Sequence, residues 1–146
     1  METDMTFILI TSLLFSSTGP GGFELGVILG EPSGISAKMW FDRDTALDGA
    51  LSWSLGSNDK LHIHADFLWH DYGLIHSTAV LPVYYGIGGR IILDDDAHLG
   101  ARVPIGISWL PDGVPLDLFV ELAGILDIIP DLDFELNGGI GIRFIF

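Results

Sequence analysis

The stretch GGIGIRFIF, Gly138–Phe146, alternates between large apolar residues and small or charged ones. Successive side chains of a β-strand point to opposite faces, so this alternation predicts a strand with two different surfaces. The residues of the apolar face are Ile140, Ile142, Phe144 and Phe146, and those of the other face are Gly139, Gly141 and Arg143.

The same alternation recurs along the rest of the chain. Segments of period two are separated by clusters of turn residues, of which Pro111-Asp112-Gly113 is the strongest hairpin signal. We count about eight segments of roughly 9 to 11 residues, the length of a membrane strand. They cover approximately residues 23–30, 35–41, 47–55, 61–70, 81–93, 99–109, 116–123 and 134–146.

Composition narrows the classes of protein to which the chain can belong. The mean hydropathy is +0.48, yet no run approaches the roughly 18 apolar residues of a membrane-spanning helix. The formal charge is −14, and Lys and Arg form no cluster, which argues against a nucleic-acid partner. Cysteine is absent, which excludes disulfides and thiolate sites. High hydropathy without a membrane-spanning helix therefore indicates that the apolar surface is distributed over strands.

Residues 1–22 differ from the remainder. The apolar run Phe7–Phe15 is followed by small residues, Ser16-Ser17-Thr18-Gly19, which is typical of a secretory signal peptide and its cleavage region. The acids Glu2 and Asp4 stand where such signals usually carry Lys or Arg. A disordered N-terminal segment or a first strand is therefore the alternative, and residues 23–146 form the barrel domain in either case.

Strand alternation fits two architectures. In a soluble lipocalin-like barrel the apolar side chains point inward, and in a membrane barrel they point outward. The minor face is mostly Gly, Ala and Ser with isolated charges, whereas a solvated face is rich in Lys, Glu, Thr and Gln. Large aromatic residues also stand near segment ends on the apolar face, as in an interfacial girdle. They are Trp53, Trp69, Tyr85, Trp109 and Phe146. We therefore expect an all-β, eight-stranded antiparallel up-and-down transmembrane β-barrel with short turns.

Charged residues on the minor face would be enclosed in the lumen, where they must pair. Symmetric hairpins would place Asp117 opposite Arg143, Phe119 opposite Gly141, Arg90 opposite Arg102, and Glu121 one diagonal step from Arg102. Glu24 and Asp66 share this face with the expected lumen charge network. The members of that network are Lys38, Asp48, Arg90, Arg102, Asp117, Glu121, Glu135 and Arg143.

His62, His64 and Asp66 stand at alternate positions on the minor face, with His70 further along, and such groups can ligate a transition metal. Pairing of Leu55 with Leu61 would also set Ser52 opposite His64 and Ser54 opposite His62. A Ser52-His64-Asp66 hydrolase grouping then becomes a geometric possibility. No Gly-flanked nucleophile accompanies it, so lumenal hydrogen bonding is the preferred role, with no enzyme activity, no cofactor and no metal.

Acidic residues gather at the expected turns on one rim of the barrel. They could hold divalent cations, although solvated turns explain them as well. These residues are Glu31, Asp59, Asp94, Asp95, Asp96, Asp127, Asp131 and Asp133.

Three stretches carry a resemblance to known proteins: LGEPSG at 29–34, LPVYYG at 81–86 and LNGGIG at 136–141. Residues 23–146 resemble the small bacterial outer-membrane barrels of the OmpA membrane-domain and OmpX type, and more closely a group of uncharacterised envelope proteins that share these stretches. The resemblance implies insertion into the outer membrane by the barrel assembly machinery. It also implies that Ile140, Ile142, Phe144 and Phe146 form the assembly signal. OmpX-type proteins carry long external loops, whereas the connections expected here are short.

The sequence thus predicts a protein of the bacterial outer membrane, with the lipid bilayer as its surroundings. Its role would be structural, or interaction within the envelope, and its lumen would be plugged by side chains and so form no general pore. Two alternatives remain open: a soluble lipocalin-like barrel that binds an apolar ligand, and a lipid-modifying outer-membrane enzyme.

Overall fold

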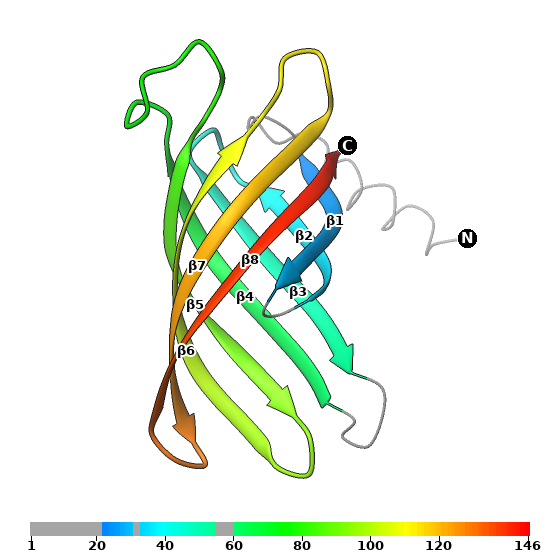
Figure 1. Cartoon of the computed structure of the whole chain (residues 1–146), viewed down its shortest axis with the longest axis vertical. Coiled ribbons are helices and arrows are strands. Elements are labelled where there is room, and N and C mark those ends of the chain that lie inside the picture. Colours follow the sequence, from blue (N-terminus) through cyan, green and yellow to red (C-terminus); the bar gives the residue numbers. More distant parts are fainter. Residues whose placement is uncertain (1–21, 31–32, 55–59) are drawn as a thin grey trace, which may run out of the picture.

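The computed structural model describes residues 22–30, 33–54 and 60–146. The expected signal segment lies outside these residues except for Gly22. Eight strands make up the described fold (Figure 1). They are β1 (Phe23–Gly30), β2 (Gly34–Trp40), β3 (Thr45–Ser54), β4 (Lys60–Asp71), β5 (Val83–Leu93), β6 (Ala97–Trp109), β7 (Leu116–Ile129) and β8 (Asp133–Ile145).

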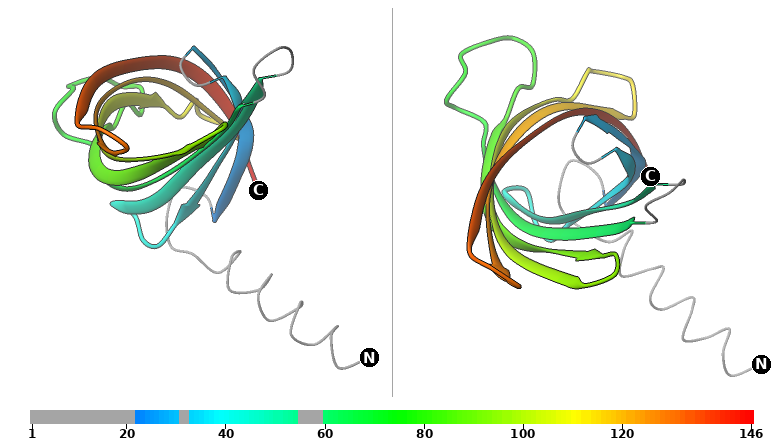
Figure 2. Two further views of the ribbon diagram at one scale, coloured as in Figure 1. Left: turned by 90° about the horizontal axis from the view of Figure 1, so that it is seen from below. Right: turned by 60° about the horizontal axis from the view of Figure 1, so that its bottom comes forward.

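Each strand pairs antiparallel with its sequence neighbour, and β1 pairs with β8, which closes the barrel. The expected all-β, eight-stranded antiparallel barrel is thereby confirmed. Figure 2 shows the strands surrounding a single interior. None of the described residues belong to a helix long and apolar enough to cross a membrane.

The start of β1 and the end of β8 lie at one end of the barrel, called here the terminal end. Connections 41–44, 72–82 and 110–115 lie at this end, and 94–96 and 130–132 lie at the opposite, far end. The expectation of short turns is wrong for residues 72–82, which form the longest described connection and project from the barrel in Figure 1. Strand lengths run from 7 residues in β2 to 14 in β7, and β7 extends to Ile129, six residues beyond the expected segment 116–123.

The pairing of β7 with β8 follows the sequence prediction. Asp117 is the partner of Arg143, and Phe119 is the partner of Gly141. A Cβ atom at Gly141 would lie 2.2 Å from Phe119 Cζ and 2.7 Å from the carbonyl oxygen of Val27. Glycine at this position therefore makes room for the Phe119 ring and for the backbone of β1.

Other predicted registers are wrong by two residues. Leu93 pairs with Ala97 across the three-residue connection 94–96, so Arg90 lies opposite Gly100 and not opposite Arg102. Likewise, the β3–β4 hairpin closes with Ser54 opposite Lys60. Turn residues located these hairpins correctly, but the number of residues in each loop fixed the register.

The two faces of the wall have opposite character. Inward positions carry most of the charged residues of the strands together with Gly, Ala and Ser, while outward positions carry Leu, Ile, Val and aromatic side chains that remain exposed. On β7, for example, Val120 is 60% exposed, and the next residue, Glu121, is buried. The alternation read from the sequence therefore assigned the inner and outer faces correctly.

Candidate functional site

Arg143 of β8 organises the lumen near the terminal end. Its Nε donates a hydrogen bond to Ser36 Oγ at 2.9 Å, and its Nη2 donates to Asp48 Oδ2 at 3.1 Å. Nη1 lies 3.6 Å from Asp117 Oδ2, and the guanidinium carbon lies 3.9 Å from the centre of the Phe119 ring. One buried cation thus holds side chains from β2, β3 and β7 together.

Lys38 of β2 forms a second buried contact set beside it. Its Nζ lies 2.8 Å from His70 Nε2, 3.6 Å from Asp117 Oδ2 and 4.2 Å from the centre of the Trp40 ring. The Trp40 Nε1–H donates to Glu24 Oε2 at 2.6 Å. These contacts tie β1, β2, β4 and β7 together.

Arg102 of β6 lies deeper in the lumen. Its Nε donates to Asp66 Oδ1 at 3.1 Å, and its Nη2 donates to Glu121 Oε2 at 3.0 Å. Tyr84 donates to the other Glu121 oxygen at 3.1 Å. The predicted contact between Arg102 and Glu121 exists, but the predicted register does not: Glu121 pairs with Gly106, and the long Arg102 side chain spans the difference.

Arg90 of β5 lies toward the far end. It donates to Asp127 through Nε, with Oδ1 at 3.0 Å, and it also pairs with Glu135. Asp127 was expected in an acidic turn, but it belongs to β7, and its buried side chain points into the lumen. Arg90, Glu135 and His62 line a polar hollow of about 350 Å³ at this end. Every member of the expected lumen charge network therefore faces the interior.

Asp48, His64 and Asp66 form one compact buried group. Each offers one ligand atom, and these atoms all lie within 4.8 Å of one another. His62, which the sequence suggested as a companion of His64 and Asp66, is not part of this group; its ring centre lies 5.9 Å from that of His64. Asp48 joins the group instead because it is the cross-strand partner of Asp66. Sequence spacing along β4 alone could not reveal this partner.

The predicted arrangement of Ser52 is wrong. Ser52 lies opposite His62, and the residue opposite His64 is Ala50, because the β3–β4 hairpin closes two residues earlier than expected. His64 Nε2 lies 3.8 Å from Asp66 Oδ2, beyond hydrogen-bonding distance. The register on which the Ser52-His64-Asp66 grouping depended is therefore not present.

The outer face carries a band of exposed aromatic side chains near the terminal end. Trp69 of β4 stacks on Tyr85 of β5 with ring centres 6.3 Å apart, and Phe67 lies 4.9 Å from Trp69. Phe146 lies 6.0 Å from Phe23 across the β8–β1 closure. All five aromatic residues singled out in the sequence are exposed. Trp69, Tyr85, Trp109 and Phe146 belong to this band, and Trp53 lies toward the far end.

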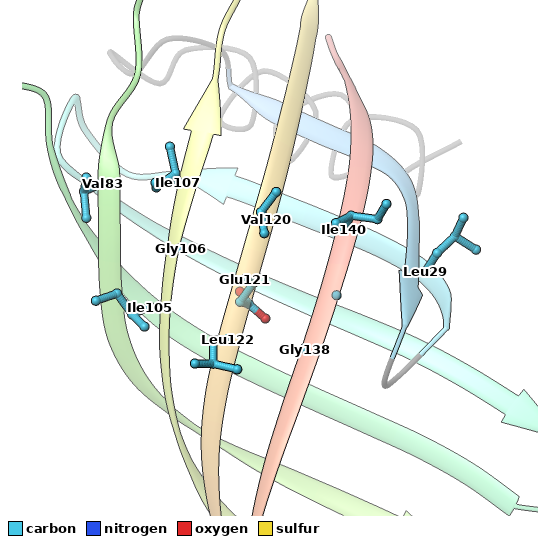
Figure 3. Close-up of a pocket in the computed structure, with 11 residues that line it drawn as sticks. Leu29, Val83, Ile105, Gly106, Ile107, Val120, Glu121, Leu122, Gly138 and Ile140 are labelled. Carbon is cyan, nitrogen blue, oxygen red and sulfur yellow. The ribbon is translucent and has the colours of Figure 1, made fainter. Parts of the chain in front are cut away.

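The outer wall over β5–β8 contains a shallow apolar hollow (Figure 3). Side chains from outward positions of four neighbouring strands line it, and Leu29 of β1 lies at its edge. Ile105, Val120 and Ile140 are more than half exposed there. The expected assembly-signal residues Ile140, Ile142, Phe144 and Phe146 all lie exposed on this outward face.

The acidic turns contain local hydrogen bonds. Asp42 Oδ1 accepts from the backbone N–H groups of Asp44 and Thr45, each at 2.8 Å, which lowers the pKa of the Asp42 carboxyl. The backbone N–H of Asp96 donates to Asp94 Oδ1 and likewise lowers its pKa. Glu31 and Asp59 lie outside the described residues. Asp94, Asp95, Asp96, Asp131 and Asp133 lie at the far end, as expected.

Comparison with known proteins adds no relative. No protein family, curated protein or solved structure matches the chain.

Proposed function

We propose that this chain is a β-barrel of the bacterial outer membrane with a structural or interaction role in the envelope. A single observation carries the proposal: the outward positions of the strands are apolar and exposed, while charged pairs fill the lumen. This distribution is the reverse of that in a water-soluble barrel, where apolar side chains fill the interior.

The size of the apolar surface supports a lipid environment. Soluble monomers rarely expose contiguous apolar patches larger than about 300 to 600 Å². Here exposed apolar residues occur on every strand, from Leu25 of β1 to Phe144 of β8. The closed barrel also pairs backbone groups between all neighbouring strands, which a chain in the hydrocarbon core requires.

The aromatic band supports the same environment. Trp and Tyr side chains favour the boundary between hydrocarbon and water, because their rings are apolar and carry one polar group. Trp69 lies opposite Tyr85, and Trp109 ends the next strand, β6, at the same end of the wall. This band would mark the level of one membrane interface.

The lumen argues for a scaffold without a general pore. Arg143, Arg102 and Arg90 and their carboxylate partners occupy successive levels of the interior. Eight strands enclose only enough width for side chains. An interaction role would fall on the connections, of which 72–82 is the longest described.

Tryptophan quenching tests the proposal. The full chain is reconstituted in vesicles whose lipids carry brominated acyl chains, and its fluorescence is compared with that of the triple variant W53F/W69F/W109F. Trp40 is buried in the lumen, whereas the three replaced residues are exposed on the outer face. We expect strong quenching of the full chain and little quenching of the triple variant.

Equal and weak quenching of both proteins would contradict the proposal, and so would full recovery of the chain in a detergent-free soluble fraction. Recovery in the soluble fraction would instead favour the alternative of a soluble lipocalin-like barrel. Strong quenching of the triple variant would show that Trp40 contacts lipid, which would contradict the assignment of the two faces.

A further inference from the structure

We propose that Asp48, His64 and Asp66 bind one divalent transition-metal ion in the interior of the barrel. The three residues come from two adjacent strands, and all are buried. The inference concerns the lumen alone, so it holds or fails independently of whether the outer face contacts lipid.

The first argument is the placement of two carboxylates directly opposite each other. Asp48 and Asp66 are cross-strand partners on the inward face, and each is almost completely buried. Like charges at directly opposed positions destabilise a sheet, more strongly away from water. Arg143 pairs with Asp48 and Arg102 pairs with Asp66, and a positive ion between the two carboxylates would remove the repulsion that these pairs leave.

The second argument is the set of polar atoms that lack partners among the described residues. Asp48 Oδ1 and His64 Nδ1 are both buried, and neither has a hydrogen-bond partner among the described residues. Arg143 binds the other Asp48 oxygen. A buried carboxylate oxygen and a buried imidazole nitrogen without partners each cost free energy, and metal ligation with a small movement of the ring would satisfy such groups.

The third argument is the local charge. Five carboxylates lie in the connected part of the lumen between the terminal end and Arg102, together with three bases; the acids are Glu24, Asp48, Asp66, Asp117 and Glu121, and the bases are Lys38, Arg102 and Arg143. With all of these ionised, the cluster carries an excess of two negative charges. One divalent cation balances this excess.

The ligand types select the class of ion. Imidazole is a ligand for zinc, copper, iron and nickel, whereas calcium and magnesium take oxygen ligands. Two carboxylates and one imidazole therefore favour a first-row transition metal, and Zn²⁺ serves as the probe. The polar hollow at the far end reaches His62, whose ring centre lies 5.9 Å from that of His64.

Calorimetry on the refolded full chain in detergent, after treatment with EDTA, tests the site. We expect one equivalent of Zn²⁺ to bind, with Ca²⁺ at least tenfold weaker. Loss of a ligand in His64→Ala should weaken zinc binding by more than about 100-fold. His62→Ala is the matched control, because His62 lies on the same strand and face but outside the group; its zinc affinity should be unchanged.

A fluorescence or circular dichroism melt records folding of each variant, and zinc should raise the midpoint of the wild type and of His62→Ala alone. The proposal is overturned if the folded wild type binds no stoichiometric zinc, which would leave Asp48 and Asp66 to share a proton. Equal loss of binding in both histidine variants, or calcium binding as tight as zinc, would overturn it as well.

Discussion

The inner and outer faces of β7 and β8 show opposite relations between polarity and burial. On the inner face, Arg143 and Asp117 are almost completely buried and contact each other, while outward Val120 and Ile140 are exposed. In a soluble protein, fully buried charges and large exposed apolar patches are both exceptions. Here they are the rule on adjacent residues, so each face should respond to mutation in its own way.

The largest effect is expected for Arg143→Met. This change leaves Asp48, Asp117 and Glu24 without their shared cation, and removing one partner of a buried pair costs about 3 to 5 kcal/mol. Urea unfolding in detergent micelles measures the loss. Arg43→Met in the exposed connection 41–44 is the control and should cost less than about 1 kcal/mol. A loss for Arg143→Met as small as the control would show that the lumen admits water freely.

Val120→Arg should reduce stability in a bilayer by about 2 to 4 kcal/mol, because it places a charge on the wall that we propose faces lipid. The matched control is Val114→Arg, since Val114 is also exposed but lies in the connection 110–115. An exposed substitution in water is usually within about 0.5 kcal/mol of neutral. Equal effects of both variants in lipid vesicles would contradict a membrane location for the outer face.

Gly141→Ala should cost about 1 to 3 kcal/mol, because its new methyl group meets the Phe119 ring and the Val27 carbonyl oxygen. Gly138 lies on the same strand, and a Cβ atom there would find its nearest neighbour at 3.7 Å. Gly138→Ala should therefore be neutral or stabilising by up to about 1 kcal/mol. Equilibrium unfolding of both variants gives the comparison; the reverse order would show that β8 packs differently.

The smallest effect is expected for Glu135→Gln. Glu135 pairs with Arg90, but its side chain is 44% exposed at the far end, so the pair is screened by water. The cost should be below about 1 kcal/mol and should shrink as salt is added. A salt-independent loss comparable with that of Arg143→Met would mean that the far end is closed to solvent.

The sequence predicted the faces better than the registers. Alternation alone placed Arg143, Lys38 and Arg102 inside, because the side-chain period of a strand is two and any even shift preserves the face. The errors at Arg90 and Ser52 were shifts of two residues, which left the faces correct and changed the neighbours. The Asp48–His64–Asp66 group was missed for this reason, since it depends on the partner across β3 and β4.

The strands β1 and β2 give the wall an uneven height. They have 8 and 7 residues, whereas β6, β7 and β8 have 13 or 14. In Figure 1 the arrow of β1 ends well above the connections between β5 and β6 and between β7 and β8. In a bilayer, the lipid beside β1 and β2 would meet a shorter apolar band than the lipid beside β7. This hydrophobic mismatch would thin the membrane on one side only, and would orient the barrel relative to its neighbours in the plane of the membrane.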